Sequence, residues 1–238
     1  MLINKETCTD CELCVNRCVV GAIKADTPEG VQIDLDECVE CGVCERYKVC
    51  PTDSLYQQKL EWPRTFRSVM SDPLSLTKET NVPGRGTEEM KTNEVTGRFQ
   101  PGWVGIGIEL GRPGISTRMT EVEKMSTELA KMGVEFEQCN PVTYAMSDTS
   151  TGKLKEEVLN ERALSAIIEF AVPADKVESV LKKIQELAPQ VDTVFSLDIC
   201  AKVEEDGVVP YKETVEKLGL WMSPNGKHNV GLGRPRVL

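Results

Sequence analysis

Eight cysteines in the first fifty residues constrain the fold of this chain more than any other feature. The first run contains Cys8, Cys11, Cys14 and Cys18, and the second contains Cys38, Cys41, Cys44 and Cys50. In each run, three thiols recur at steps of three residues, so one loop can supply three ligands of a cubane iron–sulfur cluster. The fourth ligand must come from elsewhere in the chain. We therefore expect two 4Fe-4S clusters.

Two other roles for these cysteines are weighed against the clusters. A structural zinc ion prefers two Cys-x2-Cys pairs, and it would leave the third cysteine of each run without a metal bond. A disulfide framework belongs to oxidising compartments. The number of cysteines in each run favours the clusters over both alternatives.

Residues 3–57 resemble the bacterial-type dicluster ferredoxins, which carry Cys-x2-Cys-x2-Cys-x3-Cys motifs. The resemblance implies that the fourth cysteine of each run serves the other cluster. One cluster would be bound by Cys8, Cys11, Cys14 and Cys50, and the other by Cys38, Cys41, Cys44 and Cys18. The chain departs from the family pattern in two ways: Val19 replaces a proline, and five residues rather than three separate Cys44 from Cys50.

The two cysteine runs also indicate an internal duplication. They begin 30 residues apart, and similar short segments follow them at 19–23 and 51–55. We expect a pseudo-twofold arrangement of the two halves.

The net charge and the hydrophobic pattern of the sequence restrict which partners and which cellular location we expect. The 238 residues carry a formal net charge of −10, which argues against nucleic acid as a partner. Residues 1–57 contain 11 acidic and five basic side chains, either as a solvated surface or as a surface that steers a redox partner with a basic docking face. The sequence shows no membrane span and no signal-peptide pattern, so we expect a cytoplasmic protein.

The chain divides into four predicted parts. A ferredoxin domain at 1–60 is followed by a linker or arm at 61–101, a second domain at 102–205, and a C-terminal helix with an extended tail at 206–238. Three apolar side chains in the arm, Trp62, Phe66 and Met70, argue against pure disorder, as does Phe99. The arm packs either on a partner or on the chain's own domains.

The second domain shows alternating and helical periodicities in a recognisable order. Strands are predicted at 103–110, 134–138, 164–172 and 191–203. Helices are predicted from a capping box at Thr120 and Glu123 to Gly133, and from Asp175 to the residues before Pro189. A polar loop or hairpin is expected at 140–160. The chain is thus predicted to be α+β, with a βαββαβ ferredoxin-like sandwich that resembles ACT and NIL domains by element order alone.

Several residues in the second half are weaker candidates for a site. Cys139 and Cys200 are predicted on opposite edges of the sheet and on its outer face, too far apart for a disulfide. The outer face of the first strand, with Gly105 and Gly107, is expected to pack on a partner subunit or on the cluster domain. The loop 111–117 is a weak candidate for anion binding, and His228 is expected to be a surface residue. Arg234 and Arg236 form a basic end that either docks or frays.

The primary hypothesis for function is electron transport. The chain would relay single low-potential electrons as a non-catalytic subunit of a larger anaerobic oxidoreductase complex, with redox proteins as its partners. The alternative is a ligand-sensing or sulfur-handling accessory protein that uses the ACT/NIL-like domain together with the clusters. A structural protein with inert clusters is the third possibility.

Overall fold

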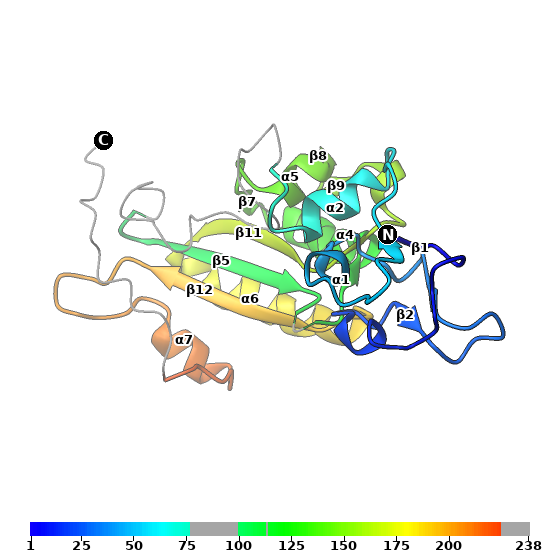
Figure 1. The fold of residues 1–238 in the computed structure, drawn as a ribbon. Coiled ribbons are helices and arrows are strands. Elements are labelled where there is room, and N and C mark those ends of the chain that lie inside the picture. The colour runs from blue at the N-terminus through cyan, green and yellow to red at the C-terminus, as the bar shows by residue number, and fades with distance from the viewer. Residues whose placement is uncertain (77–99, 113, 225–238) are drawn as a thin grey trace.

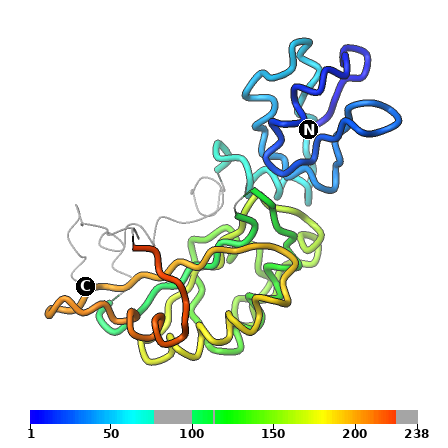
Figure 2. Tube along the Cα trace, turned by 90° about the horizontal axis from the view of Figure 1, so that it is seen from below, coloured from blue at the N-terminus to red at the C-terminus, as the bar shows by residue number. Residues whose placement is uncertain are grey.

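The computed structural model describes residues 1–76, 100–112 and 114–224 of an α+β protein (Figure 1). The N-terminal residues form a small module with short strands and many turns. The second domain is a four-stranded sheet with long helices. The two views place the module at one end of the second domain, with α2 (Thr65–Ser71) between them (Figures 1 and 2).

The backbone of the N-terminal module contains the predicted repeat. Strand β1 (Leu2–Ile3) pairs with β4 (Leu55–Tyr56), and β3 (Gln32–Ile33) pairs with β2 (Ile23–Lys24), both antiparallel. A shift of about thirty residues superposes one pair on the other in the same register. The amide of Asn4 donates to the Ser54 carbonyl at 2.8 Å, and in the other half Asp34 donates to Ala22 at 2.8 Å.

The two extra residues before Cys50 are absorbed by a longer helical turn. In the first half, the 3₁₀ turn η1 (Val15–Arg17) leads directly to Cys18. In the second half, α1 (Val43–Arg46) takes its place, and the chain then turns at Lys48, whose φ is 49°. This left-handed residue reverses the chain direction, so Cys50 still reaches the position that corresponds to Cys18.

The sheet of the second domain has the strand order β12-β5-β11-β7. Its strands are β5 (Trp103–Leu110), β7 (Glu135–Phe136), β11 (Ala166–Pro173) and β12 (Phe195–Ala201), and all neighbours are antiparallel. The first and third strands of the domain occupy the centre, as a βαββαβ order requires. Two strands are shorter than predicted, because β7 has two residues and β12 begins at Phe195.

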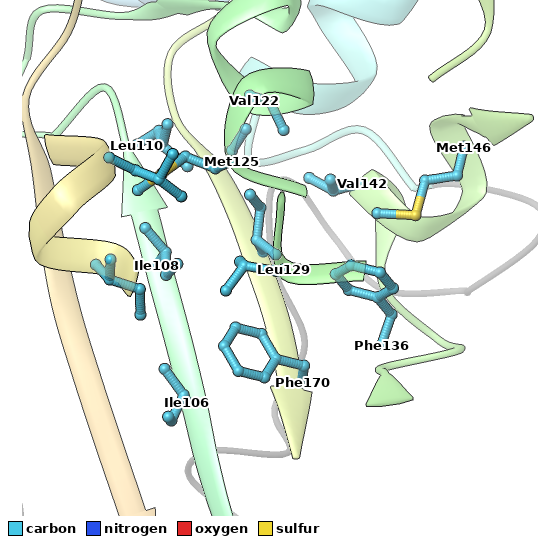
Figure 3. Packing of buried hydrophobic residues seen from close by; sticks show 14 of the residues in the cluster. Ile106, Ile108, Leu110, Val122, Met125, Leu129, Phe136, Val142, Met146 and Phe170 are labelled. Atoms are coloured by element: carbon cyan, nitrogen blue, oxygen red, sulfur yellow. The ribbon is translucent and has the colours of Figure 1, made fainter. Parts of the chain in front are cut away.

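Helices α4 (Met119–Lys131) and α6 (Val177–Leu187) supply the other half of the core. Figure 3 shows Met125 and Leu129 of α4 beside the β5 side chains Leu110 and Ile108, and Val122 of the same helix belongs to the same buried cluster. All five of these side chains are fully buried. Apolar burial on this face of the sheet is the main force that holds the domain together.

The capping box predicted for the first long helix is wrong, and neither long helix has a side-chain cap. Thr120 lies inside α4, and the first amides of that helix are satisfied by tertiary partners: Met119 donates to the Glu161 carbonyl at 3.0 Å and Thr120 to Leu159 at 3.1 Å. Glu123 instead accepts the amide of Leu154 at 2.7 Å. Helix α6 begins at Val177, after the 3₁₀ turn η3 (Ala174–Lys176), with no side-chain cap.

The segment predicted as a polar loop or hairpin contains a hairpin and further regular structure. It forms α5 (Pro141–Ala145), the hairpin of β8 (Met146–Asp148) with β9 (Lys153–Leu154), and the turn η2 (Glu156–Val158). Next, β10 (Arg162–Ala163) pairs with β6 (Thr117–Arg118). After α6, the chain continues through η4 (Ala188–Gln190) and β12 to the helix α7 (Lys212–Lys217), which agrees with the predicted C-terminal helix.

Helix α2 lies inside the predicted linker but belongs to the core. Phe66 and Met70 are buried in the same apolar cluster as Val104 of β5. The described part of the arm therefore packs on the chain's own second domain. Phe99 lies outside the described residues.

Candidate metal centre

The structure brings Cys8, Cys11, Cys14 and Cys50 together around one hollow, called here the outer site. The hollow has a volume of about 330 Å³ that includes open solvent, and its wall also contains Glu12, Leu13 and Thr52. Three of the cysteines come from the loop between β1 and η1. Cys50 comes from the other half of the repeat, as the family pattern implied.

A second hollow, the inner site, is surrounded by Cys18, Cys38, Cys41 and Cys44. Its volume is about 370 Å³, again including open solvent, and its wall also contains Arg17, Val39 and Glu40. Three cysteines come from the second half and Cys18 from the first. The predicted crossing of the fourth cysteines is thus present in the geometry of the chain.

The thiols of Cys18 and Cys50, which each complete the cysteine set of the other half, have equivalent surroundings. The Cys18 Sγ accepts the amide of Ala22 at 3.1 Å, and the Cys50 Sγ accepts the amide of Ser54 at 3.2 Å. Each bond spans four residues, and the residue before each donor has a positive φ, 66° at Gly21 and 50° at Asp53. An N–H bond to sulfur stabilises a thiolate and tunes a bound cluster.

The pKa values of the thiols depend on burial and on one another. Burial, followed by the charges of Cys41, Cys38 and Cys18, raises the pKa of Cys44 to about 12. At Cys50 burial also opposes ionisation, but hydrogen bonds from Thr52 and Ser54 overcome it and lower the pKa to about 7. Burial also raises the pKa values of Cys38 and Cys41. Three of the four thiols of the inner site therefore need a positively charged group among them in order to ionise, and this set of donors fits an iron–sulfur core.

Arginines surround the loop that carries Cys38 and Cys41. The buried Arg67 of α2 donates through Nη1 to the carbonyls of Asp36 at 2.7 Å and Cys38 at 2.9 Å, and through Nε to Glu161 at 2.5 Å. Arg46 donates to the Cys41 carbonyl at 2.5 Å.

Two arginines of the second domain pair with acids of the same loop. Arg162 contacts Glu37 at 2.7 Å, and Arg118 bonds Asp36. The hydrogen bond from Arg118 holds the pKa of Asp36 below its ordinary value. These arginines carry no signal in the sequence, because their partners are remote along the chain.

These contacts correct the expected position of the cluster module. The outer face of β5, next to Gly105 and Gly107, was expected to pack either on this module or on a partner subunit. The contacts described here lie instead at the end of the sheet, where β6 and β10 carry Arg118 and Arg162. A Cβ added to Gly114 would lie 3.4 Å from the Val19 carbonyl, so the loop after β5 also reaches the inner site.

The two remaining cysteines converge on neither site. Cys139 is exposed beyond the end of β7, and Cys200 lies on β12 opposite Gly105. The two cysteines lie toward opposite edges of the sheet, as predicted. The loop 111–117 contains the pair of Arg112 with Glu109 at 2.9 Å. His228, Arg234 and Arg236 lie outside the described residues.

Three further findings concern single metal ions, membrane-spanning helices and similarity to known proteins. Within the described residues, no group of three or more His, Cys, Asp or Glu side chains could hold a single metal ion. None of the described helices has the length and apolarity needed to cross a membrane. No family model, curated protein or solved structure matches the chain.

Proposed function

We propose that this protein is an iron–sulfur electron carrier with two 4Fe-4S clusters, held in a module of the dicluster ferredoxin kind. The observation that carries the proposal is the assembly of two complete sets of four cysteines around two separate hollows. When bound, such clusters exchange single electrons. The acidic surface and the second domain favour a role as a subunit that docks to a redox partner.

The chain's own residues would hold and insulate the clusters. The loops 8–14 and 38–44 supply three thiols each, and Cys50 and Cys18 close the two sets. Val31 and Leu55 line the outer site, and Val39 and Ile33 line the inner site. Apolar walls of this kind limit the access of water and of oxidants to a cluster.

Iron content tests this proposal directly. After anaerobic reconstitution we expect about eight irons per chain, with visible absorption that a low-potential reductant bleaches reversibly. Cys11→Ala and Cys41→Ala should each leave about four irons, because each removes one ligand set. Cys139→Ala is the matched control and should retain all of the iron. Four irons or fewer in the unaltered chain would contradict the proposal.

A further inference from the structure

The module contains its own internal comparison, because its two halves share one backbone but not one environment. Shifted by thirty residues, Asp36, Cys38 and Cys41 of the second half correspond to Glu6, Cys8 and Cys11 of the first. The amide of Cys8 donates to the Asn4 carbonyl at 3.0 Å, and the amide of Cys38 donates to Asp34 at 2.9 Å. Differences between the two sites therefore arise from the side chains packed around them.

As far as the described residues show, only the second half has arginine side chains that donate to the carbonyls of its ligand loop. Arg67 donates to the Cys38 carbonyl and Arg46 to the Cys41 carbonyl. At the equivalent carbonyls of Cys8 and Cys11, the described part of the chain provides no side-chain donor.

The acidic side chains of the two halves also differ in their contacts with arginines. In the second half Asp36, Glu37 and Glu40 are each paired with an arginine, from Arg118, Arg162 and Arg64 respectively. In the first half Glu6 and Glu12 are exposed, and neither forms an ion pair within the described residues. The loop of the inner site is thus balanced in charge, whereas the loop of the outer site keeps its negative charge.

We propose that Arg67 and Arg46 are positioning residues that raise the reduction potential of the inner site above that of the outer site. This inference rests on the proposed function. A positive charge and N–H donors near a cluster favour the reduced form, and uncompensated carboxylates disfavour it. An electron donated by a reduced partner protein, which is thereby oxidised by one electron, therefore settles at the site that contacts the second domain. No bond or proton need change in this step.

A pair of substitutions with opposite expected signs tests the proposal. Arg67→Met removes a positive charge and should shift the potential of the inner site downward. Glu161→Gln removes the negative partner of the same guanidinium and should shift that potential upward. A purely structural role of the pair would instead move both variants in the same direction. Lys131→Met, whose partner Glu128 lies on α4 away from the module, is the control for a change in net charge and should shift neither potential.

The measurement is a redox titration followed by electron paramagnetic resonance. Cys11→Ala and Cys41→Ala, each keeping one site, assign the two signals. If Arg67→Met does not fold, Arg46→Gln removes the donor to the Cys41 carbonyl of the same ligand loop and should also lower the inner potential. Equal potentials at the two sites, or a shift confined to the outer site, would overturn the inference. A low iron content would overturn the proposed function instead, so the two failures are distinguishable.

Discussion

The hydroxyl of Ser126 donates to the carbonyl of Gly152 at 2.6 Å, which ties the middle of α4 to the turn between β8 and β9. Ser126 is fully buried, and the chain approaches so closely that a Cβ on Gly152 would lie 2.3 Å from the Ser126 carbonyl oxygen. Gly152 also has a φ of 68°. Both the conformation and the contact therefore require glycine at this position.

Gly152→Ala should destabilise the second domain because the helix and the hairpin must separate. We expect a loss of about 2–4 kcal/mol in the free energy of unfolding, from backbone strain and overpacking together. Gly133→Ala is the matched control, since Gly133 has a φ of 71° but open space around its Cα. It should cost only about 1 kcal/mol. Equal losses in denaturant unfolding would show that the close approach does not matter.

Met70→Ala tests whether α2 is part of the second domain. Met70 is fully buried in the core cluster, so its truncation should lower the free energy of unfolding by about 2–5 kcal/mol. Leu74→Ala, four residues later, removes a side chain that is 73% exposed and should have an effect below about 0.5 kcal/mol. The measurement is thermal or denaturant unfolding followed by circular dichroism. A small loss of stability in Met70→Ala would show that α2 belongs to the linker and not to the second domain.

Cys200 should resist alkylation in the folded protein while Cys139 reacts. Burial, and then the charge of Glu169, raises the pKa of Cys200 to about 12 from an ordinary value of 9.0. Cys139 is exposed. Iodoacetamide labelling with peptide mass spectrometry should therefore modify Cys139 and leave Cys200 unmodified until the protein unfolds.

The same pKa shift predicts a dependence of stability on alkaline pH. The thiol of Cys200 binds its proton more tightly in the folded chain than in the unfolded chain. Its contribution is therefore complete below about pH 9 and decreases as the pH rises toward about 12. Cys200→Ala should reduce this part of the alkaline loss of stability, measured by unfolding at a series of pH values. An unchanged pH profile would contradict the assignment.

The long periodic elements of the second domain could be predicted because burial alone determines them. The alternation of Ile106, Ile108 and Leu110 gave β5, and the spacing of Val122, Met125 and Leu129 gave α4. The helix caps could not be predicted in this way. The first amides of α4 bond to the carbonyls of Glu161 and Leu159, so no capping side chain is needed.

At the cysteine sites, too, features set by nearby residues could be predicted, and contacts between residues far apart in the sequence could not. Spacing predicted the two ligand loops, and the resemblance to ferredoxins supplied the crossing of Cys18 and Cys50. The arginines around the inner site have no such signal. Arg67 forms a hydrogen bond with Glu161, 94 positions away, and Arg162 with Glu37, 125 positions away. The residue pattern of one sequence carries no information on contacts at that separation.

The separation between Arg67 and Glu161 also has a consequence for biosynthesis. A growing chain contains both cysteine loops long before Glu161 leaves the ribosome, so the buried guanidinium lacks its carboxylate during that interval. Arg67 can form its ion pair with Glu161 only after that residue has been added. The N-terminal module therefore acquires its last contacts with the second domain late in translation.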